Sequence, residues 1–333
     1  MLSVIFDWVE FTILEVSLKD AFEILELPFS DFMPLSKGRF GYRNQLKWSM
    51  GNVFVMFTAK TDEIDENTLI DSKTGVHVMI TGQGCRQYSA NQDLLRLVGT
   101  LYLLPRVNFS RIDLAIDDYN SQIISYDRIN QAALARNFTS RWSKWDEINS
   151  RQTSTGAFLG RTMYFGSQAS DLFCRIYDKT LERKANAEDE RDIPKSWTRL
   201  EVVYRKERAT KLVEHLMQGL PIGEALRGTL KQYIRFLKPT SDTNKSRWPT
   251  ATWWEIFLQK VESLQLTIKK ESKSIEDIAA WVDKQIGPSL AAILKAHEGD
   301  LDWLRQVIAK GSHRLSRRHI DAINIYKGQL QND

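Results

Sequence analysis

The chain has 333 residues, of which 42% are apolar and 26% are charged, and its formal net charge is +4. This size and composition are typical of a soluble globular protein with one or two domains, and they exclude disordered and fibrous proteins. Cys85 and Cys174 have no CxxC or Cys/His neighbours, which argues against a disulfide framework and a structural zinc site. We expect a cytoplasmic protein, because no basic leader and no apolar run of about 18 residues occurs.

The N-terminal part of the chain predicts strands with short helices between them. Residues 4–13 predict a strand in which Asp7 is the conspicuous polar side chain, and Ser17 and Pro28 delimit a short helix. Further strands are predicted at 47–50, 52–58 and 75–81, with an acidic loop at 60–74 and a helix at 92–102. Residues 82–88 contain two glycines but lack the rest of a phosphate-binding loop, so we interpret them as a turn.

Residues 109–119 form the clearest predicted strand. Its apolar residues alternate with Arg111, Asp113 and Asp117, which therefore share one face. An arginine and two carboxylates opposite a buried face indicate a functional surface, although an ordinary solvated face is the alternative. A helix with Ser125 as its N-cap, a polar loop, and strands at 156–159 and 162–166 follow.

The segment 171–182, DLFCRIYDKTLE, predicts a strand that carries a tyrosine between two cations. Arg175, Tyr177 and Lys179 are two residues apart and share a face. A phenol is a poor nucleophile at its usual pKa near 10, and neighbouring cations favour its ionised form and attract a phosphate. Tyr177 is therefore a candidate nucleophile, with half-buried packing as the alternative interpretation.

Residues 197–206 repeat the pattern of the 109–119 strand, with Arg199, Glu201 and Arg205 on one face. If the polar faces of these three strands converge in one sheet, they build a site with a nucleophile, cations and carboxylates. From Ala209 onward the pattern is helical. We therefore predict an α+β fold with a twisted, mostly antiparallel sheet backed by helices, a catalytic domain at 1–208 and a helical C-terminal region at 209–333.

Several motifs in their order along the chain resemble the replication initiation factor family, which includes rolling-circle plasmid initiators, related conjugative-element relaxases and filamentous phage initiators. The motifs are FDWVEFTI, RIDLAIDDY, MYFGSQASDLFCRIYDK, TRLEVVYRK and SRWPTATWWEIFL, between residue 4 and about residue 260. The resemblance implies a site-specific nicking enzyme whose tyrosine becomes joined to the 5′ phosphate of cut DNA. Tyr177 matches the tyrosine of the family's Tyr-Asp-Lys motif, with Arg175 and Lys179 beside it.

The resemblance also implies a divalent metal held by carboxylates, and oxygen ligands suit Mg²⁺ or Mn²⁺. Asp113 and Asp117 lie about 13 Å apart along one strand, too far to share a metal comfortably. We therefore prefer Asp113 with Glu201 and keep Asp117 or Asp7 as the substitute. The five histidines are scattered and lack the histidine-hydrophobe-histidine motif of the other large nickase group.

Further expectations concern partners and alternative functions. We assign DNA contacts to Arg111, Arg199 and Arg205, and expect origin DNA, as duplex and as an extruded single strand or hairpin, as the main partner. The family also implies a homodimer, with a host helicase as a candidate partner. Because the chain begins directly at the first predicted strand, we expect it to lack the additional N-terminal DNA-binding domain of some relaxases in the family. A non-catalytic DNA-binding protein and a metal-dependent hydrolytic nuclease, which uses water and leaves no protein on the DNA, are the two competing functions.

Overall fold

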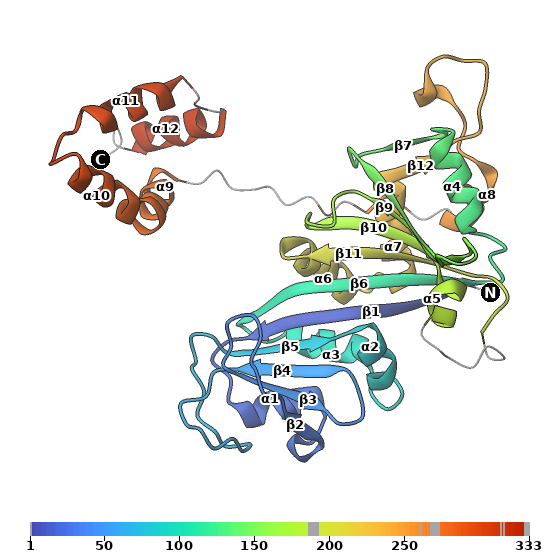
Figure 1. The fold of residues 1–333 in the computed structure, drawn as a ribbon, viewed down its shortest axis with the longest axis horizontal. Helices are drawn as coiled ribbons and strands as arrows, with labels where there is room; N and C mark the ends of the chain where they lie inside the picture. Colours follow the sequence, from blue (N-terminus) through green and yellow to red (C-terminus); the bar gives the residue numbers. More distant parts are fainter. Residues whose placement is uncertain are drawn as a thin grey trace. The chain divides into compact units, whose positions relative to one another are not determined.

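A computed structural model describes residues 2–185, 193–259, 262–264, 266, 274–313, 315 and 317–329. The chain folds into two compact units, Met1–Ile268 and Lys269–Asp333. Every strand of the described residues belongs to the first unit (Figure 1). The boundary between the units therefore lies well beyond Ala209, and the helices that directly follow the sheet pack with it.

The first unit is built on one ten-stranded sheet in which all neighbouring strands are antiparallel. Its strands lie in the order β2-β3-β4-β5-β1-β6-β11-β10-β9-β8. Their bounds in chain order are β1 Leu2–Ile13, β2 Phe32–Pro34, β3 Asn44–Trp48, β4 Val53–Phe57, β5 Val76–Ile80, β6 Val107–Tyr119, β8 Trp145–Arg151, β9 Phe158–Phe165, β10 Leu172–Asp178 and β11 Trp197–Arg205. The predicted α+β fold is confirmed.

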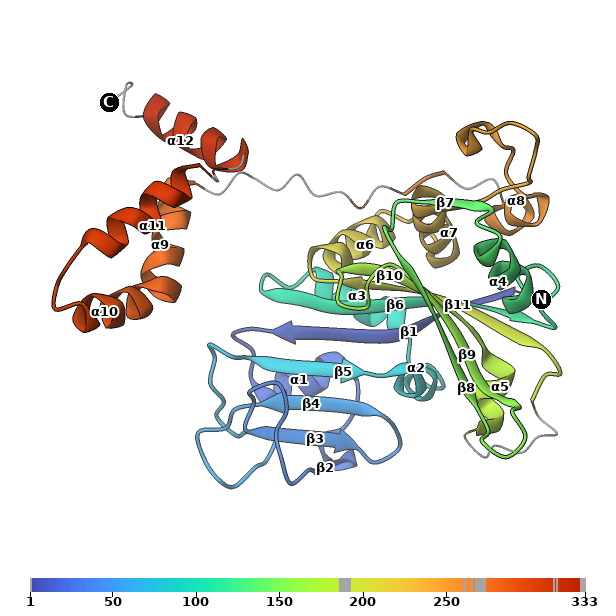
Figure 2. The same cartoon turned by 45° about the horizontal axis from the view of Figure 1, so that its top comes forward.

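One face of the sheet is apolar and is covered by helices. Ile112, Leu114 and Ile116 of β6 are fully buried on this face. The helices that pack there include α1 (Leu18–Leu25), α3 (Leu94–Tyr102), α6 (Glu207–Met217) and α7 (Ile222–Tyr233) (Figure 2). Alternation along β6 thus sends Ile112, Leu114 and Ile116 into this core and Arg111, Asp113 and Asp117 to the opposite face.

Four local structures differ from the sequence predictions. Residues Gly82–Tyr88 form helix α2 and not a turn, because the Thr81 hydroxyl caps its first turn. The segment before β9, predicted as a polar loop, contains the edge strand β8. The strand predicted to include Lys179 ends at Asp178, and helix α5 (Lys179–Ala185) begins at the next residue. The helical pattern predicted from Ala209 onward is interrupted after Tyr233, where Ile234–Phe236 (β12) pairs with β7 (Phe138–Ser140).

The remaining helices of the first unit are α4 (Tyr126–Leu134) and α8 (Thr252–Leu258). The second unit contains α9 (Ile275–Trp281), the π-helical turn Val282–Ile286, α10 (Gly287–Ala296), α11 (Asp302–Ser312) and α12 (Arg317–Gln329). None of the described helices is long and apolar enough to cross a membrane. The boundary at Ala209 between a catalytic domain and a helical C-terminal region stays a prediction about function. The packing of the chain divides it after Ile268.

Candidate active site

The register of the sheet brings the three predicted polar faces together. Arg199 on β11 lies opposite Asp117 on β6, and also opposite Tyr177 on β10 on its other side. Glu201 lies opposite Arg175 in the same way. Directly opposed residues of antiparallel strands share a face of the sheet. The predicted convergence of these strands is therefore confirmed.

Asp7 joins this face because of an irregularity in β1. The register between β1 and β6 shifts between Phe6 and Trp8, so Asp7 is the extra residue of a β-bulge. A bulge redirects a side chain, and Arg199 Nη1 donates a hydrogen bond of 2.6 Å to Asp7 Oδ1. Gly82 packs against the bulge: a Cβ atom at Gly82 would lie 3.1 Å from the Asp7 carbonyl oxygen and 3.2 Å from Oδ1.

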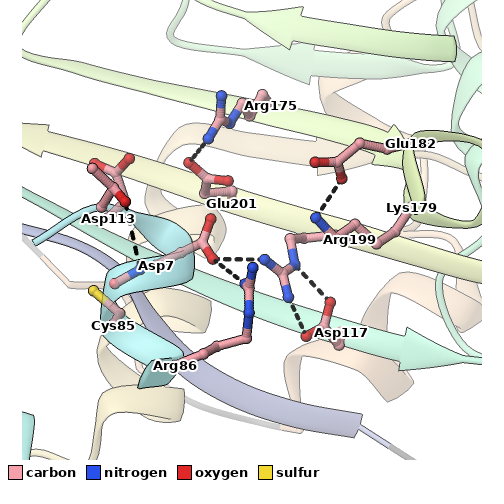
Figure 3. Close-up of polar contacts among 12 residues, drawn as sticks. Asp7, Cys85, Arg86, Asp113, Asp117, Arg175, Lys179, Glu182, Arg199 and Glu201 are labelled. Carbon is pink, nitrogen blue, oxygen red and sulfur yellow. Dashed lines mark hydrogen bonds and ion pairs between the residues drawn. The ribbon is translucent and has the colours of Figure 1, made fainter. Parts of the chain in front are cut away.

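Arg199 is the central cation of the site, with 1% of its surface exposed. Its Nε and Nη2 donate to the two carboxylate oxygens of Asp117, both at 2.7 Å, while Nη1 binds Asp7 (Figure 3). Trp197 Nε1 donates a further hydrogen bond of 2.7 Å to Asp117 Oδ1. The hydrogen bonds from Arg199 to Asp117 and to Asp7 thus join β11 to β6 and to β1. Each of these buried charges has a partner of opposite charge.

Two further arginines of this face also pair with buried carboxylates. Arg175 forms an ion pair with Glu201, and Arg111 Nε donates a hydrogen bond of 2.8 Å to Asp113 Oδ1. Glu201 and Asp113 are both fully buried. The Arg111 guanidinium also lies 4.3 Å from the centre of a Trp8 ring, which fixes its orientation.

Tyr177 lies between the predicted cations. The Arg175 guanidinium and the Lys179 amine lie 5.7 and 5.5 Å from the centre of its ring. Nevertheless, burial and the nearby negative charge of Glu201 raise the pKa of Tyr177 well above its usual value. Arg175 pairs with Glu201 and Lys179 with Glu182, and in the protein alone burial outweighs the predicted effect of these cations on the phenol.

Lys179 reaches Tyr177 from helix α5 and not from the strand. Its side chain is buried, with 4% of the residue exposed, and its amine pairs with Glu182. Burial, together with repulsion from Arg199, lowers the pKa of Lys179. The pKa of Tyr177 is raised and that of Lys179 is lowered, so in the protein alone a proton passes from the phenol to the amine at a larger free-energy cost than between the free side chains. The lowered pKa of Lys179 does make its neutral amine, the form that can accept a proton, more abundant.

Tyr164 is closer to the site than its sequence neighbours indicate. It lies directly opposite Arg175 in the pairing of β9 with β10, and both residues line the same cavity. The residues beside Tyr164 in sequence carry no charge, and the cation next to it comes from the adjacent strand. Tyr177 differs from Tyr164 in having the Lys179 amine over its ring.

The carboxylates differ in how well they fit a metal ion. Glu201 Oε1 pairs with Arg175, whereas its Oε2 is buried without a hydrogen-bond partner. Burial raises the pKa of Glu201 and of neighbouring Asp113. Burial, and next the charge of Glu201, raise the pKa of Asp7 to about 6. Clustered carboxylates with raised pKa values suit a hard divalent cation. Asp117 fits less well, since Arg199 occupies both of its oxygens.

The described residues contain no group of three or more His, Cys, Asp or Glu side chains already arranged to hold a metal ion. The fit to a divalent cation therefore rests on the oxygens of Glu201 and on its contacts with Asp7 and Asp113. Sequence reasoning kept Asp7 only as a substitute because the bulge that turns it inward has no clear sequence signal.

The three arginines assigned to DNA have different surroundings. Arg199 is almost completely buried, and Arg111 is held by Asp113, so both support the site more than they offer a free phosphate contact. Arg205 is more accessible: its guanidinium lies 5.2 Å from the centre of the Phe173 ring and donates to the Gln168 carbonyl oxygen at 2.5 Å. The assignment of DNA contacts to these three arginines stays a prediction.

A cavity of about 870 Å³ opens over this face. The side chains that matter most on its walls are Asp7, Tyr164, Arg175, Tyr177, Lys179 and Arg199. Helix α2 contributes Arg86, whose Nη1 lies 3.5 Å from Asp7 Oδ1, an approach that sequence reasoning missed because it assigned a turn there. A tyrosine, several cations and the buried carboxylate of Asp7 thus surround one space of a size usual for ligand sites.

This fold and site define a class of DNA-processing proteins, and comparisons with known families agree. Residues 107–308 match the family described as "Replication initiation factor", and residues 3–103 match the "Rolling Circle replication initiation protein N-terminal domain". The chain belongs to the replication initiation factor family of rolling-circle initiators and relaxases.

Two relatives are similar over most of the chain. The "Putative DNA relaxase NicK" of Bacillus subtilis (strain 168) is 26% identical over 274 residues, which cover 78% of this chain and 74% of that protein. The structure of a rolling-circle replication initiator protein from Geobacillus stearothermophilus superposes with a TM-score of 0.68 at 29% identity, covering 80% of this chain and 99% of the other.

Proposed function

We propose that this protein nicks one strand of origin DNA at a specific site and rejoins it, with Tyr177 as the nucleophile. The observation that carries the proposal is the position of Tyr177 on the cavity wall, with Lys179 over its ring and Arg199 directly opposite. Membership of the initiator and relaxase family supports the same activity.

In the proposed reaction, Tyr177 Oη forms a bond to the scissile phosphorus and the bond from phosphorus to the 3′ oxygen breaks. The products are a 5′-phosphotyrosine and a DNA end with a 3′ hydroxyl, which takes up one proton. The phenol loses one proton, and Lys179 is the proposed acceptor, because its lowered pKa makes the neutral amine more abundant and its amine lies 5.5 Å from the centre of the Tyr177 ring. Attack by a 3′ hydroxyl on the phosphotyrosine reverses these steps and rejoins the strand.

Cations stabilise the charge that develops on the phosphate. Arg175 lies on the cavity wall beside Tyr177, and its ion pair with Glu201 holds the guanidinium at this position. Arg199 lines the same cavity while Asp117 and Asp7 fix its orientation. Preorganised positive groups of this kind lower the barrier because they need no rearrangement during the reaction.

A divalent cation, Mg²⁺ or Mn²⁺, belongs to the proposal. Glu201 and Asp113, with Asp7 beside them, would hold it, and Asp117 would act as a positioning residue for Arg199. The bound ion would supply Lewis-acid stabilisation at the scissile phosphate. The proposal also includes a homodimer and a host helicase as partner, which the family resemblance implies.

The decisive experiment compares Tyr177→Phe with Tyr164→Phe on a suicide oligonucleotide that carries the nick site of the replicon encoding the protein. Tyr177→Phe should lose nicking and covalent attachment while it retains its fold and its DNA affinity. Tyr164→Phe should still nick and form the adduct. Peptide mapping of the trapped adduct identifies the attacking residue, and an adduct on Tyr164 would overturn the assignment.

The same assay separates the competing functions. A hydrolytic nuclease would cut the oligonucleotide in Mg²⁺ or Mn²⁺ and leave no protein on either product. A non-catalytic DNA-binding protein would shift the oligonucleotide in a gel without cutting it. Only a tyrosine transesterase gives a protein-linked 5′ end together with a free 3′ hydroxyl.

A further inference from the structure

Helix α2 brings a cation to the active-site cavity from outside the three strands of the predicted polar face. Arg86 of this helix lines the cavity, and its side chain is 39% exposed. Its guanidinium extends from α2 toward Asp7, next to Arg199 (Figure 3). Arg86 therefore lines the same space as the proposed nucleophile, although the two residues are far apart in the sequence.

Packing against the sheet holds α2, and with it Arg86, in place. The Asn52 side-chain amide donates a hydrogen bond of 3.0 Å to Gln83 Oε1, and its backbone N–H donates one of 2.9 Å to Gln87 Oε1. A Cβ atom at Gly84 would overlap the Asn52 carbonyl oxygen, so only a glycine permits this close approach of the helix. The helix thus presents its arginine to the cavity from a fixed position.

The charge of Arg86 is compensated less closely than that of Arg199. Both oxygens of Asp117 bind Arg199 at 2.7 Å. In the part of the chain that the structure describes, the only hydrogen bond of the Arg86 side chain is its contact of 3.5 Å with Asp7 Oδ1, which also accepts from Arg199 at 2.6 Å. Charge-assisted hydrogen bonds are usually about 2.7–2.9 Å long. Because a guanidinium has five N–H donors, Arg86 keeps most of them for a group that enters the cavity.

We propose that Arg86 binds a phosphate of the DNA strand in the cavity, next to the scissile phosphate. This inference rests on the proposed function, which supplies DNA as the ligand. Helix α2 packs on β1, and the sheet order β1-β6-β11-β10 puts β1 on one side of Arg199 and Tyr177 on the other. Strands about 4.8 Å apart place β1 and β10 about 14 Å from each other. Arg86 therefore holds a neighbour of the phosphate that Tyr177 attacks.

The chemistry of the side chain suits this role. The planar guanidinium matches two oxygens of one phosphate, and its charge does not depend on pH in the working range of a protein. Helix α2 precedes β6 in the chain, whereas Tyr177 follows it. The N-terminal part of the chain thus grips the strand that the later part cuts.

The test measures DNA binding without nicking, in the full-length chain carrying Tyr177→Phe and without added metal. The probe is a fluorescein-labelled single strand with the nick site of the replicon that encodes the protein, followed by fluorescence anisotropy. Adding Arg86→Gln should weaken binding about ten-fold or more, because a charge-assisted hydrogen bond is lost. Arg96→Gln is the matched control, since Arg96 is an exposed arginine of helix α3, on the opposite face of the sheet. It should bind within about two-fold of the Tyr177→Phe chain.

A set of modified probes identifies the phosphate that Arg86 contacts. In each probe one phosphate is replaced by an uncharged methylphosphonate. In the Tyr177→Phe chain, replacing the contacted phosphate should weaken binding about ten-fold. With Arg86→Gln added, the same replacement should have little effect, because its partner is already missing, and the effects at all other positions should stay. A general change in the fold would instead lower the affinity for every probe.

A second measurement covers the case in which Arg86→Gln folds poorly. Arg86→Cys and Arg96→Cys introduce accessible thiols, whereas Cys85 and Cys174 are buried. A saturating amount of the nick-site strand should slow maleimide labelling of the thiol at position 86 several-fold and leave the thiol at position 96 unaffected.

Three results would overturn the assignment of Arg86. They are binding by the Arg86→Gln chain within about two-fold of the Tyr177→Phe chain, equal sensitivity of both chains to every methylphosphonate, and equal labelling of the thiol at position 86 with and without DNA. Because no step of this test depends on the tyrosine, a failure of Tyr177 as nucleophile would show only in the nicking assay. The two proposals can therefore fail independently.

Discussion

Arg175 on β10 and Glu201 on β11 lie directly opposite each other, and their ion pair joins the strand of the proposed nucleophile to that of a proposed metal ligand. Glu201 is fully buried, whereas the Arg175 side chain is 31% exposed and reaches the cavity. Arg175 therefore has two roles, because it compensates a buried charge and presents its own charge to the site.

Replacing Arg175 should show the first of these roles, the compensation of the buried Glu201 charge. Arg175→Ala leaves the Glu201 carboxylate buried without its partner, which should lower the free energy of unfolding by about 3–5 kcal/mol. Adding Glu201→Gln should restore most of this loss, because the amide carries no charge. Urea denaturation of the two single variants and the double variant measures the coupling. A loss below about 1 kcal/mol for Arg175→Ala would show that the pair does not stabilise the sheet.

The carboxylates should separate into metal ligands and a positioning residue. Asp113→Asn and Glu201→Gln should each weaken Mn²⁺ binding by about ten-fold or more, measured by titration calorimetry, and should abolish metal-dependent nicking. Binding to origin DNA should remain, because it depends mainly on Lys and Arg contacts to phosphates.

Asp117→Asn provides the matched comparison. It should leave Mn²⁺ affinity nearly unchanged and still slow nicking, because Arg199 loses the carboxylate that orients it. If Asp117→Asn weakens Mn²⁺ binding as much as Asp113→Asn does, Asp117 is a ligand and Asp7 is not needed in the metal site.

The raised pKa of Asp7 predicts a specific pH dependence of stability. The folded protein holds the Asp7 proton up to a pKa of about 6, whereas the unfolded chain releases it near 3.8. The protonated Asp7 therefore stabilises the fold at low pH. As the pH rises from 3.8 to about 6, about 3 kcal/mol of this contribution to the free energy of unfolding is lost. Asp7→Asn should remove this component of the pH profile, and unfolding titrations between pH 4 and pH 7 measure the difference.

The ionisation of Asp7 should have opposite effects on stability and on activity: as the pH rises, stability should decrease and nicking should increase. A cation binds the ionised carboxylate, so metal-dependent nicking should increase as the pH rises through about 6. In Asp7→Asn this increase should disappear or move to another pH. An unchanged pH profile of nicking in Asp7→Asn would exclude Asp7 from the metal site.

Lys179 should act on the chemical step and not on DNA binding. Lys179→Gln removes the proposed proton acceptor, and the single-turnover nicking rate should decrease by about 10²–10⁴-fold. Lys179→Arg keeps the charge but holds its proton, so it should be nearly as slow. Both variants should bind origin DNA with close to parental affinity. If Lys179→Arg nicks at the parental rate, Lys179 acts through its charge and another group accepts the proton.

The sequence by itself determined the polar face of the sheet. Alternation in β6, β10 and β11 fixes which residues share a face, since side chains in a strand alternate with a period of two. Arg111, Asp113, Tyr177, Arg199 and Glu201 could therefore be selected without coordinates. The ordered motifs likewise indicated the family, because a set of local patterns is far more specific than any one of them.

Tertiary structure alone decided which of these groups touch. The cross-strand register pairs Arg175 with Glu201 and brings Arg175 next to Tyr164, and no local pattern encodes this register. The bulge at Asp7 and the cap at Thr81 likewise depend on neighbours distant in sequence. The pKa of Tyr177 follows from burial and from carboxylates on other strands, so the cations beside it in sequence gave the wrong sign.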